Sequence, residues 1–363
     1  SITTGLHEAQ EMEFISKARA ASSDISEALP ADRIMAAVER SGLDFTSDHG
    51  KTQLQAVHEL GEGGKLGVMI GAAGAGKTTL LQPLVSAWQE DQRRVYGIAL
   101  AWRQADDLID AGIARQDAKA ISVFFKAVEK GDVVLDHKAV VVVDEMSLLG
   151  TRQGLDLLRL RDEHKFQLVM IGDDKQCASI EAGPIIDLTR KALGEQKVPE
   201  ILTTVRQQIE RERDIAGLFR DGKAGLALGM KREDGTVELV PGGYRDAAER
   251  TAALMIDRIK ANQGDDKFTI TVSAPTNTDA HRLSLSIREQ RRALGDIGPD
   301  LVKIKAADRD GNNYDMKLAA GDRVRLFHSV APEGQRGGSI GRNGSILTVQ
   351  SADKHGMLVR NAK

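Results

Sequence analysis

A glycine-rich stretch between an apolar run and a helical pattern constrains the fold of this chain most strongly. The stretch is Gly71-Ala72-Ala73-Gly74-Ala75-Gly76-Lys77-Thr78, which has the G-x-x-x-x-G-K-[ST] pattern of a phosphate-binding loop. The residues at 66–70 indicate a buried strand, and those at 79–85 indicate the start of a helix. The glycines let consecutive backbone N–H groups surround phosphate oxygens, and the helix N-terminus adds partial positive charge. An ordinary glycine-rich turn is the alternative, but the strand–loop–helix context favours a nucleoside triphosphate site.

Two residues of this loop have predicted chemical roles. Lys77 would reach the β- and γ-phosphates, and the hydroxyl of Thr78 would bind Mg²⁺. The predicted nucleotide-binding residues in this segment are Gly71, Ala72, Ala73, Gly74, Ala75, Gly76, Lys77, Thr78 and Thr79.

A fully apolar run at 139–143 ends in the acidic pair Asp144-Glu145. Because ligands bind beyond the carboxyl ends of strands in open α/β sheets, we expect this pair near the phosphate-binding loop. Asp144 would hold Mg²⁺ through water, and Glu145 would orient and deprotonate the attacking water. In isolation such a pair is also typical of a strand that ends at the surface. Its place after a phosphate-binding loop favours the catalytic interpretation.

A third apolar run, at 168–171, ends in Gly172-Asp173, and Gln176 follows. A neutral amide at this place would hydrogen-bond the γ-phosphate in one state and lose it in another, so Gln176 is a candidate sensor. Most Gly-Asp pairs only form turns. Here the pair comes third along the chain, after the phosphate-binding loop and the acidic pair, and this order favours a functional role. The adjacent Cys177 is predicted to be a small buried hydrophobic residue.

Apolar runs alternate with amphipathic helical patterns along the first half of the chain. Strands are predicted at 66–70, 95–100, 138–144 and 167–172. Such an alternation indicates a parallel sheet with helices on both faces, so the predicted fold class is α/β. The predicted nucleotide-binding domain covers 46–190. A helical segment at 1–45 precedes it, whose predicted buried residues are Met12, Phe14, Ile15, Ile34, Met35 and Val38.

The α/β pattern restarts in a second predicted unit at 191–300. Its predicted strands lie at 201–205, 236–240 and 269–274, and its helices at 244–262 and 277–294. From 301 to 363 the chain has short β segments joined by Gly, Asn and Asp turns, which indicates a small barrel or hairpin insert. Its predicted strands lie at 302–304, 323–327, 345–349 and 357–359.

The composition excludes several classes of protein. One cysteine among 363 residues excludes an internal disulfide framework and fits a reducing compartment. No run approaches the ~18 apolar residues of a membrane span, and no export signal precedes the first helix. We therefore expect a cytoplasmic protein without membrane insertion. The absence of an initiator Met indicates a chain cut from a longer one. A net charge of −3 neither requires nor excludes nucleic acid.

The order of these motifs, with Ile180-Glu181-Ala182-Gly183 after Gln176, resembles the RecD-like superfamily 1B DNA helicases. More narrowly, the chain is similar to the helicase part of conjugative relaxase–helicases of the TraI/TrwC/TraA type. The segment with Thr3, Thr4, Glu8 and 12–20 is similar to the linker before that helicase. The resemblance covers nearly all of the chain and is strongest from 52 to 208.

This resemblance implies two RecA-like P-loop domains and an SH3-like insert, with ATP and Mg²⁺ bound between the domains. Gln53 is placed like an adenine-reading glutamine, and Arg206 like the arginine that reaches the γ-phosphate. The predicted catalytic residues are then Lys77, Glu145, Gln176 and Arg206. The predicted DNA-binding residues are Ala101, Trp102, Arg103, Thr276 and Asn277.

The resemblance also implies a bacterial motor that moves 5′→3′ on single-stranded DNA during conjugative plasmid transfer. Its partners would be single-stranded DNA, a relaxase domain in the same parent chain and a conjugative coupling or secretion apparatus. Three alternatives stay open: a RecD-like DNA-repair helicase, a truncated ATP- and DNA-binding module without motor activity, and an unrelated P-loop ATPase.

The chain departs from the family pattern in three places. Ala101 stands where many relatives have a phosphate-contacting Thr. In the family, the arginine that reaches the γ-phosphate is followed by a glutamine. This Arg-Gln pair matches Arg206-Gln207 if one residue is deleted upstream; otherwise Gln207 stands where the arginine is expected. A transition-state cation accelerates phosphoryl transfer by orders of magnitude, which favours Arg206. The late DNA-coupling and arginine motifs are missing before Lys363, which predicts a fragment or an incomplete ATP cycle.

Two further features have alternative interpretations. The helix at 277–294 carries His281, Arg282, Arg288, Arg291 and Arg292. Its arginines indicate either salt-sensitive phosphate binding or a solvated face balanced by Glu289. Trp102 would stack a base, worth ~1–3 kcal/mol per base in single-strand binders, or else be a core or interdomain residue.

Overall fold

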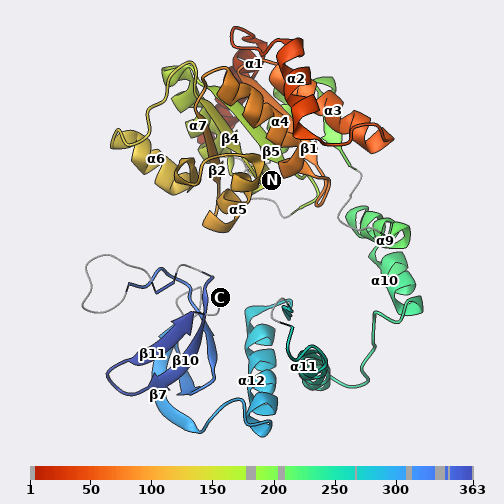
Figure 1. Cartoon of the computed structure of the whole chain (residues 1–363), viewed down its shortest axis with the longest axis vertical. Coiled ribbons are helices and arrows are strands. Elements are labelled where there is room, and N and C mark those ends of the chain that lie inside the picture. Colours follow the sequence, from red (N-terminus) through yellow and green to blue (C-terminus); the bar gives the residue numbers. More distant parts are fainter. Residues whose placement is uncertain are drawn as a thin grey trace. The chain divides into compact units, whose positions relative to one another are not determined.

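The fold is described from a computed structural model of the 363-residue chain (Figure 1). The structure describes residues 5–176, 185–202, 209–265, 268–307, 313–331, 340–341 and 344–361. The chain divides into two units, Ser1–Asp234 and Gly235–Lys363, each described here by itself. The predicted domain boundaries at 45/46, 190/191 and 300/301 stay predictions.

The first unit is built on one six-stranded sheet with strand order β3-β2-β4-β5-β1-β6. All of its strand pairs are parallel. The strands are β1 (Leu66–Gly71), β2 (Val95–Ala99), β3 (Ala118–Ala120), β4 (Val140–Val143), β5 (Gln167–Gly172) and β6 (Glu200–Ile201). The α/β class and the four predicted strands of this domain are confirmed. The segment predicted to open a second sheet at 201 instead begins within β6, beside β1.

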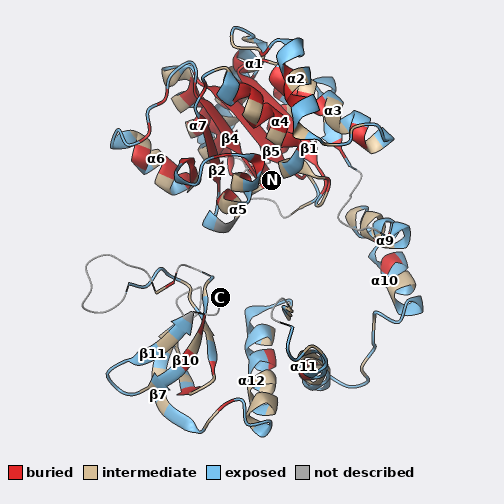
Figure 2. Cartoon of the chain, viewed as in Figure 1, coloured by how far each residue is buried: buried red, intermediate tan, exposed pale blue. Residues whose placement is uncertain are grey.

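The two faces of the sheet have separate apolar cores. The strands between these cores are buried and are coloured red in Figure 2. One core includes residues of α1 (Gly5–Ser23), α6 (Ile121–Glu129), α7 (Thr151–His164) and α8 (Ile185–Leu193). The other includes residues of α2 (Ala31–Ser41), α3 (Asp48–Gly61) and α4 (Lys77–Glu90). The four valines of β4 alternate between the two cores, and all four are fully buried. A run without polar residues therefore fits a strand covered on both faces.

The N-terminal helices complete both faces of this sheet. Phe14 of α1 is fully buried on one face, and Ile34 and Val38 of α2 are buried on the other, as predicted. Met12 and Met35 are exposed instead, at 66% and 37%. Their helices bury a narrow stripe, and these two side chains lie beside it rather than in it.

Short elements and a helix pair make up the rest of the first unit. The short elements are α5 (Trp102–Asp107), η1 (Leu108–Ala111), η2 (Arg115–Asp117), η3 (Met146–Leu148) and η4 (Glu195–Lys197). The helix pair is α9 (Glu210–Arg220) and α10 (Ala224–Glu233). Several ion pairs join the two helices; for example, Lys231 Nζ lies 2.6 Å from Glu212 Oε2, and Arg211 Nε lies 2.6 Å from Asp234 Oδ1.

The second unit consists of two helices and two small antiparallel sheets. The helices are α11 (Tyr244–Ala261) and α12 (Asn277–Ala293), which match the predicted helices. One sheet is the hairpin of β7 (Asp300–Ala307) and β8 (Asn313–Ala319). The other has the order β11-β10-β9, with β9 (Arg323–Arg325), β10 (Ile346–Ala352) and β11 (Met357–Asn361). The predicted β-rich character after residue 301 is confirmed.

The predicted strands at 236–240 and 269–274 do not form. Both segments are described, and neither has a strand assigned. Within the described residues, no strand pairs with either segment, and neither contains a buried residue. A strand needs a neighbour to accept its backbone hydrogen bonds. The parallel sheet expected for a second RecA-like domain is therefore not formed in the described part of the second unit.

Candidate nucleotide-binding site

Three predicted motifs meet at the carboxyl edge of the first sheet. β1 runs into the phosphate-binding loop, β4 into Asp144-Glu145, and β5 into Asp173. Because β1 and β4 both pair with β5 in parallel, their carboxyl ends lie at one edge. Lys77 is close enough to act electrostatically on both Asp144 and Glu145. The structure therefore brings Lys77, Asp144 and Glu145 to one edge of the sheet, and their catalytic roles stay predictions.

Glycines shape the phosphate-binding loop at two places. Gly74 and Gly76 have φ of +76° and +78°, in the left-handed region that favours glycine. At Gly71, a Cβ would lie 2.7 Å from the side chain of Lys77. Glycine there lets Lys77 fold back, and its Nζ donates to the Gly71 carbonyl at 2.9 Å. Gly76 is the N-cap of α4, so Thr78 and Thr79 lie in the first turn of that helix.

The rest of the protein fixes the outside of this loop. The Ala75 carbonyl accepts a hydrogen bond from Gln53 Nε2 at 2.9 Å. The amide of Ala72 donates to the Ile201 carbonyl at 2.8 Å, and the amide of Ala73 to Asp173 Oδ2 at 2.8 Å. Gln53 thus lies beside the loop, as expected for a residue of the nucleotide site. Its reading of adenine stays a prediction.

The acidic pair is buried in a way that opposes its ionisation. Burial raises the pKa of Asp144, against the opposing effects of the Glu145 amide and of Lys77. Burial also raises the pKa of Glu145, again against Lys77. Glu145 Oε2 is buried without a hydrogen-bond partner in the described part of the chain. Both carboxylates therefore lie where a cation is electrostatically favoured.

Glu145 has an unusual backbone conformation. Its φ of +55° and ψ of +45° are left-handed, which is rare for a residue other than glycine. Strained residues of this kind cluster at functional sites. Gly172 supports the turn that follows, because a Cβ there would lie 2.6 Å from Met146 Cγ.

The residues present fit Mg²⁺. The carboxylate of Asp144 and the hydroxyl of Thr78 are oxygen donors, the type that Mg²⁺ prefers. Asp144 directly follows β4, and Thr78 lies in the first turn of α4, which begins at the same edge of the sheet. When bound, Mg²⁺ would neutralise charge on the phosphates.

The turn after β5 contains Asp173, which belongs to the predicted Gly-Asp pair but for which the sequence predicted no role of its own. Asp173 is 1% exposed, and its carboxylate binds the Ala73 amide of the phosphate-binding loop. It also accepts from the Lys175 amide at 3.0 Å and from Arg220 at 2.5 Å. Gln176 lies just beyond and is half-buried. Its backbone N–H donates a long hydrogen bond to the Asp173 carbonyl at 3.4 Å. An acidic residue after a buried strand was a weak signal for this position.

Several predicted residues lie outside the described residues. These are Arg206 with Gln207, Cys177, and the Glu181-Ala182-Gly183 segment. Their predicted roles stay predictions.

The first predicted DNA segment follows β2 at the same edge of the sheet. Ala101 is the exposed N-cap residue of α5, and its amide donates to Gln104 Oε1 at 3.2 Å. Leu100 and Trp102 are 40% and 39% exposed. Trp102 is therefore not a core residue of the first unit. The Arg103 side chain lies outside the described part of the chain.

The second predicted DNA segment lies in the second unit. Thr276 is the N-cap of α12, and its Oγ1 accepts from the Asp279 amide at 3.1 Å. Asn277 is the first residue of that helix. The Thr276 hydroxyl therefore caps a helix, and a DNA contact by either residue stays a prediction.

The arginines of α12 pair with acidic residues of their own unit. Arg288 lies 2.9 Å from Asp322 and 2.8 Å from Asp300, and Arg292 also lies 2.5 Å from Asp300. These contacts hold the pKa of Asp300 at about 2. Of the two interpretations of this helix, the structure favours internal balance of charge, although the partners are Asp300 and Asp322 rather than Glu289.

Comparison with known proteins identifies the family. The chain is 25% identical over 317 residues to the conjugal transfer protein TraA of Rhizobium radiobacter, covering 85% of this chain and 27% of that protein. It is 27% identical over 249 residues to the RecBCD enzyme subunit RecD of Mycolicibacterium smegmatis, covering 62% and 43%. A family model described as an AAA domain matches residues 49–241, more than half of the chain. The chain belongs to the RecD-like superfamily 1 helicases.

The matched segment of this RecD-like helicase contains the phosphate-binding loop, the acidic pair and the turn after β5. The resemblance stated from the motifs is therefore confirmed. The chain spans about a quarter of the length of the TraA proteins that it matches, 27% and 25% for two of them. Among the described residues, no helix has both the length and the apolar composition that a membrane crossing needs.

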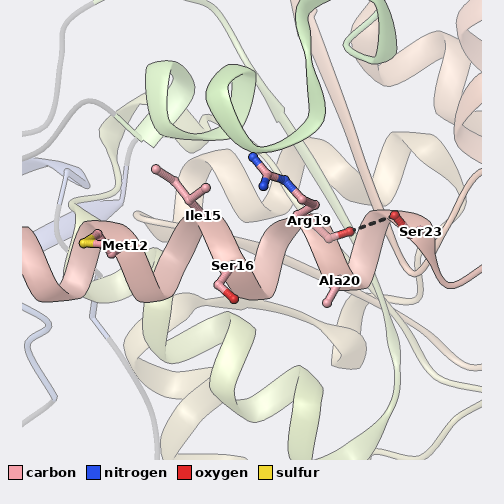
Figure 3. Close-up of a pocket in the computed structure, with 6 residues that line it drawn as sticks. All are labelled: Met12, Ile15, Ser16, Arg19, Ala20 and Ser23. Atoms are coloured by element: carbon pink, nitrogen blue, oxygen red, sulfur yellow. Dashed lines mark hydrogen bonds between the residues drawn. The ribbon is translucent and has the colours of Figure 1, made fainter.

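One surface groove of this RecD-like helicase lies away from these motifs. It runs along α1 and is lined by Met12, Ile15, Ser16, Arg19, Ala20 and Ser23 (Figure 3). The Ser23 hydroxyl donates to the Arg19 carbonyl at 3.0 Å. None of the predicted site residues lines this groove.

Proposed function

We propose that this chain is an ATP-hydrolysing motor on single-stranded DNA. The observation that supports this most is the group formed by Lys77, Asp144 and Glu145 at the sheet edge. In this proposal Lys77 would bind phosphate, Asp144 and Thr78 would bind Mg²⁺, and Glu145 would activate the attacking water. The proximity of Lys77 to the two carboxylates supports these roles. A raised pKa suits a general base that must accept a proton near neutral pH.

The proposed track is single-stranded DNA. The exposed Leu100-Ala101-Trp102 segment supports this because it offers an aromatic ring at the edge that holds the nucleotide loop. A role in conjugative transfer is proposed from the likeness to the conjugal transfer proteins TraA. Movement in the 5′→3′ direction and a relaxase domain in the parent chain are proposed from the motif resemblance alone. Gln176 as sensor and Arg206 as the γ-phosphate cation complete the proposed machinery. A cytoplasmic location is proposed on the same basis.

A RecD-like repair helicase is the second candidate. The similarity to the RecBCD subunit RecD supports it, over a smaller share of this chain than the TraA similarity. The two candidates share the nucleotide site and differ in the parent protein. A module that binds ATP and DNA without turnover remains the third.

The test is ATP turnover of this chain with and without single-stranded DNA, beside Lys77→Ala. We expect turnover that rises with DNA and falls at least ~100-fold in the variant, because the lysine stabilises charge on the transferred phosphoryl group. Lys51→Ala, an exposed lysine of α3, is the matched control. Nucleotide binding without turnover would support the third candidate. If the chain bound neither nucleotide nor DNA, the proposal would be wrong.

A further inference from the structure

Arg220, in the last turn of α9, lies against the turn that follows β5. Its guanidinium makes two hydrogen bonds there, with NH1 2.5 Å from Asp173 Oδ1 and NH2 2.7 Å from Asp174 Oδ1. The Arg220 side chain is 18% exposed and that of Asp173 only 2%. The contact is thus a largely buried, charge-assisted pair of a type that holds geometry strongly.

Asp173 joins this arginine to the phosphate-binding loop. Its other oxygen, Oδ2, accepts the amide of Ala73 at 2.8 Å. One carboxylate therefore binds the loop, the β5 turn through the Lys175 amide, and α9 through Arg220. The direction of the Ala73 amide sets how the following amides face a phosphate, because consecutive peptide planes are linked.

The charges around this contact alternate in sign. Asp174 pairs with Arg220 and also with Arg190 at 3.2 Å, and Arg190 lies 2.5 Å from Glu200 of β6. Without Arg220, the carboxylate of Asp173 would be buried with no cationic partner among these residues. A buried carboxylate that loses its cation is strongly disfavoured, so it would move away from its position beside the Ala73 amide.

We propose that Arg220 is a positioning residue of the nucleotide site. It holds the Asp173 carboxylate directed at the Ala73 amide, and so fixes the phosphate-binding loop in the form that takes nucleotide. Because α9 also pairs with α10, nucleotide affinity is linked to the placement of this helix pair. This inference rests on the proposed ATP site.

The experiment measures ATP turnover and the affinity for a non-hydrolysable ATP analogue in five variants. In Arg220→Ala we expect the KM for ATP and the analogue Kd to rise roughly 10- to 100-fold, the scale of a lost charged hydrogen bond. The kcat should change far less, because the loop binds ground state and transition state alike. Arg220→Lys keeps the charge but not the two-pronged geometry, so its effect should be intermediate. Arg213→Ala, an exposed arginine of the same helix, should match the wild type.

The last two variants, Asp173→Asn and Asp173→Asn combined with Arg220→Ala, complete a double-mutant cycle. In an Asp173→Asn background, Arg220→Ala should add little to the loss of affinity, because the partner that it positions is already neutral. Equal effects in both backgrounds would overturn the inference, as would an Arg220→Ala variant that binds the analogue like Arg213→Ala. If Arg220→Ala fails to fold, Arg220→Lys and the Asp173→Asn cycle built with it decide in the same way. If the wild type binds no nucleotide, the proposed function itself fails.

Discussion

Glu145 is the residue at which stability and chemistry conflict most directly. It has a left-handed backbone, a pKa raised by burial, and a buried oxygen without a partner in the described residues. Each of these features costs free energy in the ligand-free protein. Sites built for catalysis often carry such costs, and removing them stabilises the fold while activity is lost.

Replacing Glu145 with Gln should therefore raise stability and abolish turnover. Because the amide carries no charge to desolvate, we expect a gain of about 1 kcal/mol in the free energy of unfolding near neutral pH. Loss of the general base should lower kcat at least ~100-fold. Thermal unfolding and ATP turnover measure the two effects, with Glu129→Gln, an exposed glutamate of α6, as control. A less stable Glu145→Gln protein would contradict the interpretation.

His49 should give the protein a pH-dependent stability in the weakly acidic range. Burial lowers its pKa below the ordinary value of 6.5, against a hydrogen bond to the Ala75 backbone that raises it. The unfolded chain then binds more protons than the folded one just below pH 6.5, so stability is full above that pH and falls as pH decreases through it.

Denaturant unfolding at several pH values between 7 and 5 tests this. The wild type should lose more stability over that range than His49→Gln, which cannot take up the proton. Equal slopes in the two proteins would show that His49 does not carry the effect.

At the scale of elements, Arg288 is one of the arginines that join α12 to the β segments of its unit. Arg288 donates to both oxygens of the buried Asp322, whose Oδ2 also accepts the Ala319 amide at 2.7 Å. These carboxylates raise the pKa of Arg288 well above its usual value. The pair links helix and strand, and it leaves this arginine unavailable to a phosphate.

Arg288→Ala should lower the free energy of unfolding of the second unit by roughly 2–3 kcal/mol, because it leaves Asp322 buried and unpaired. DNA affinity and its salt dependence should stay the same. Arg282→Ala, an exposed arginine of the same helix, is the control and should leave stability within ~0.5 kcal/mol. A loss of DNA affinity in Arg288→Ala without a loss of stability would restore the DNA-binding interpretation.

The elements differ in how far the sequence could predict them. The strands of the first sheet are apolar throughout because both of their faces are buried, and such runs are visible in one sequence. The segments at 236–240 and 269–274 also have strand-like patterns, but a pattern does not supply the neighbour with which a strand pairs. The short β3 and β6 were missed because so few residues carry no periodicity.

The candidate site shows the same limit. Lys77, Thr78, Asp144 and Glu145 were predictable because the chemistry requires these residue types at fixed places beside strand ends. Arg220 was not, because its link to Asp173 joins residues far apart in sequence and follows no short motif. The bounds of α12 and the face that carries its arginines could be predicted from the sequence. Their acidic partners Asp300 and Asp322 could not, because they lie in other segments of the unit.

At the scale of the whole molecule, the division into two units predicts two unfolding transitions. The phosphate-binding loop lies in the first unit, Ser1–Asp234. A ligand stabilises only what it binds, by about 2.7 kcal/mol at one hundred times its Kd. Adding ATP analogue with Mg²⁺ should therefore raise the melting temperature of one transition and leave the other in place.

Differential scanning calorimetry with and without the analogue measures this. The shift should vanish in Lys77→Ala. If both transitions moved together, the two units would unfold as one.

The placement of α1 also bears on how the chain comes off the ribosome. Phe14, Ala18 and Ala21 of this helix share their core with residues of α7 and α8, the last of which ends at Leu193. At roughly 5–20 residues per second, the helix waits on the order of ten to thirty seconds before its partners emerge. Throughout that time its apolar stripe lacks the two helices against which it packs. Helix α1 is thus synthesised long before its core is complete, which makes early release of the nascent chain a route to aggregation.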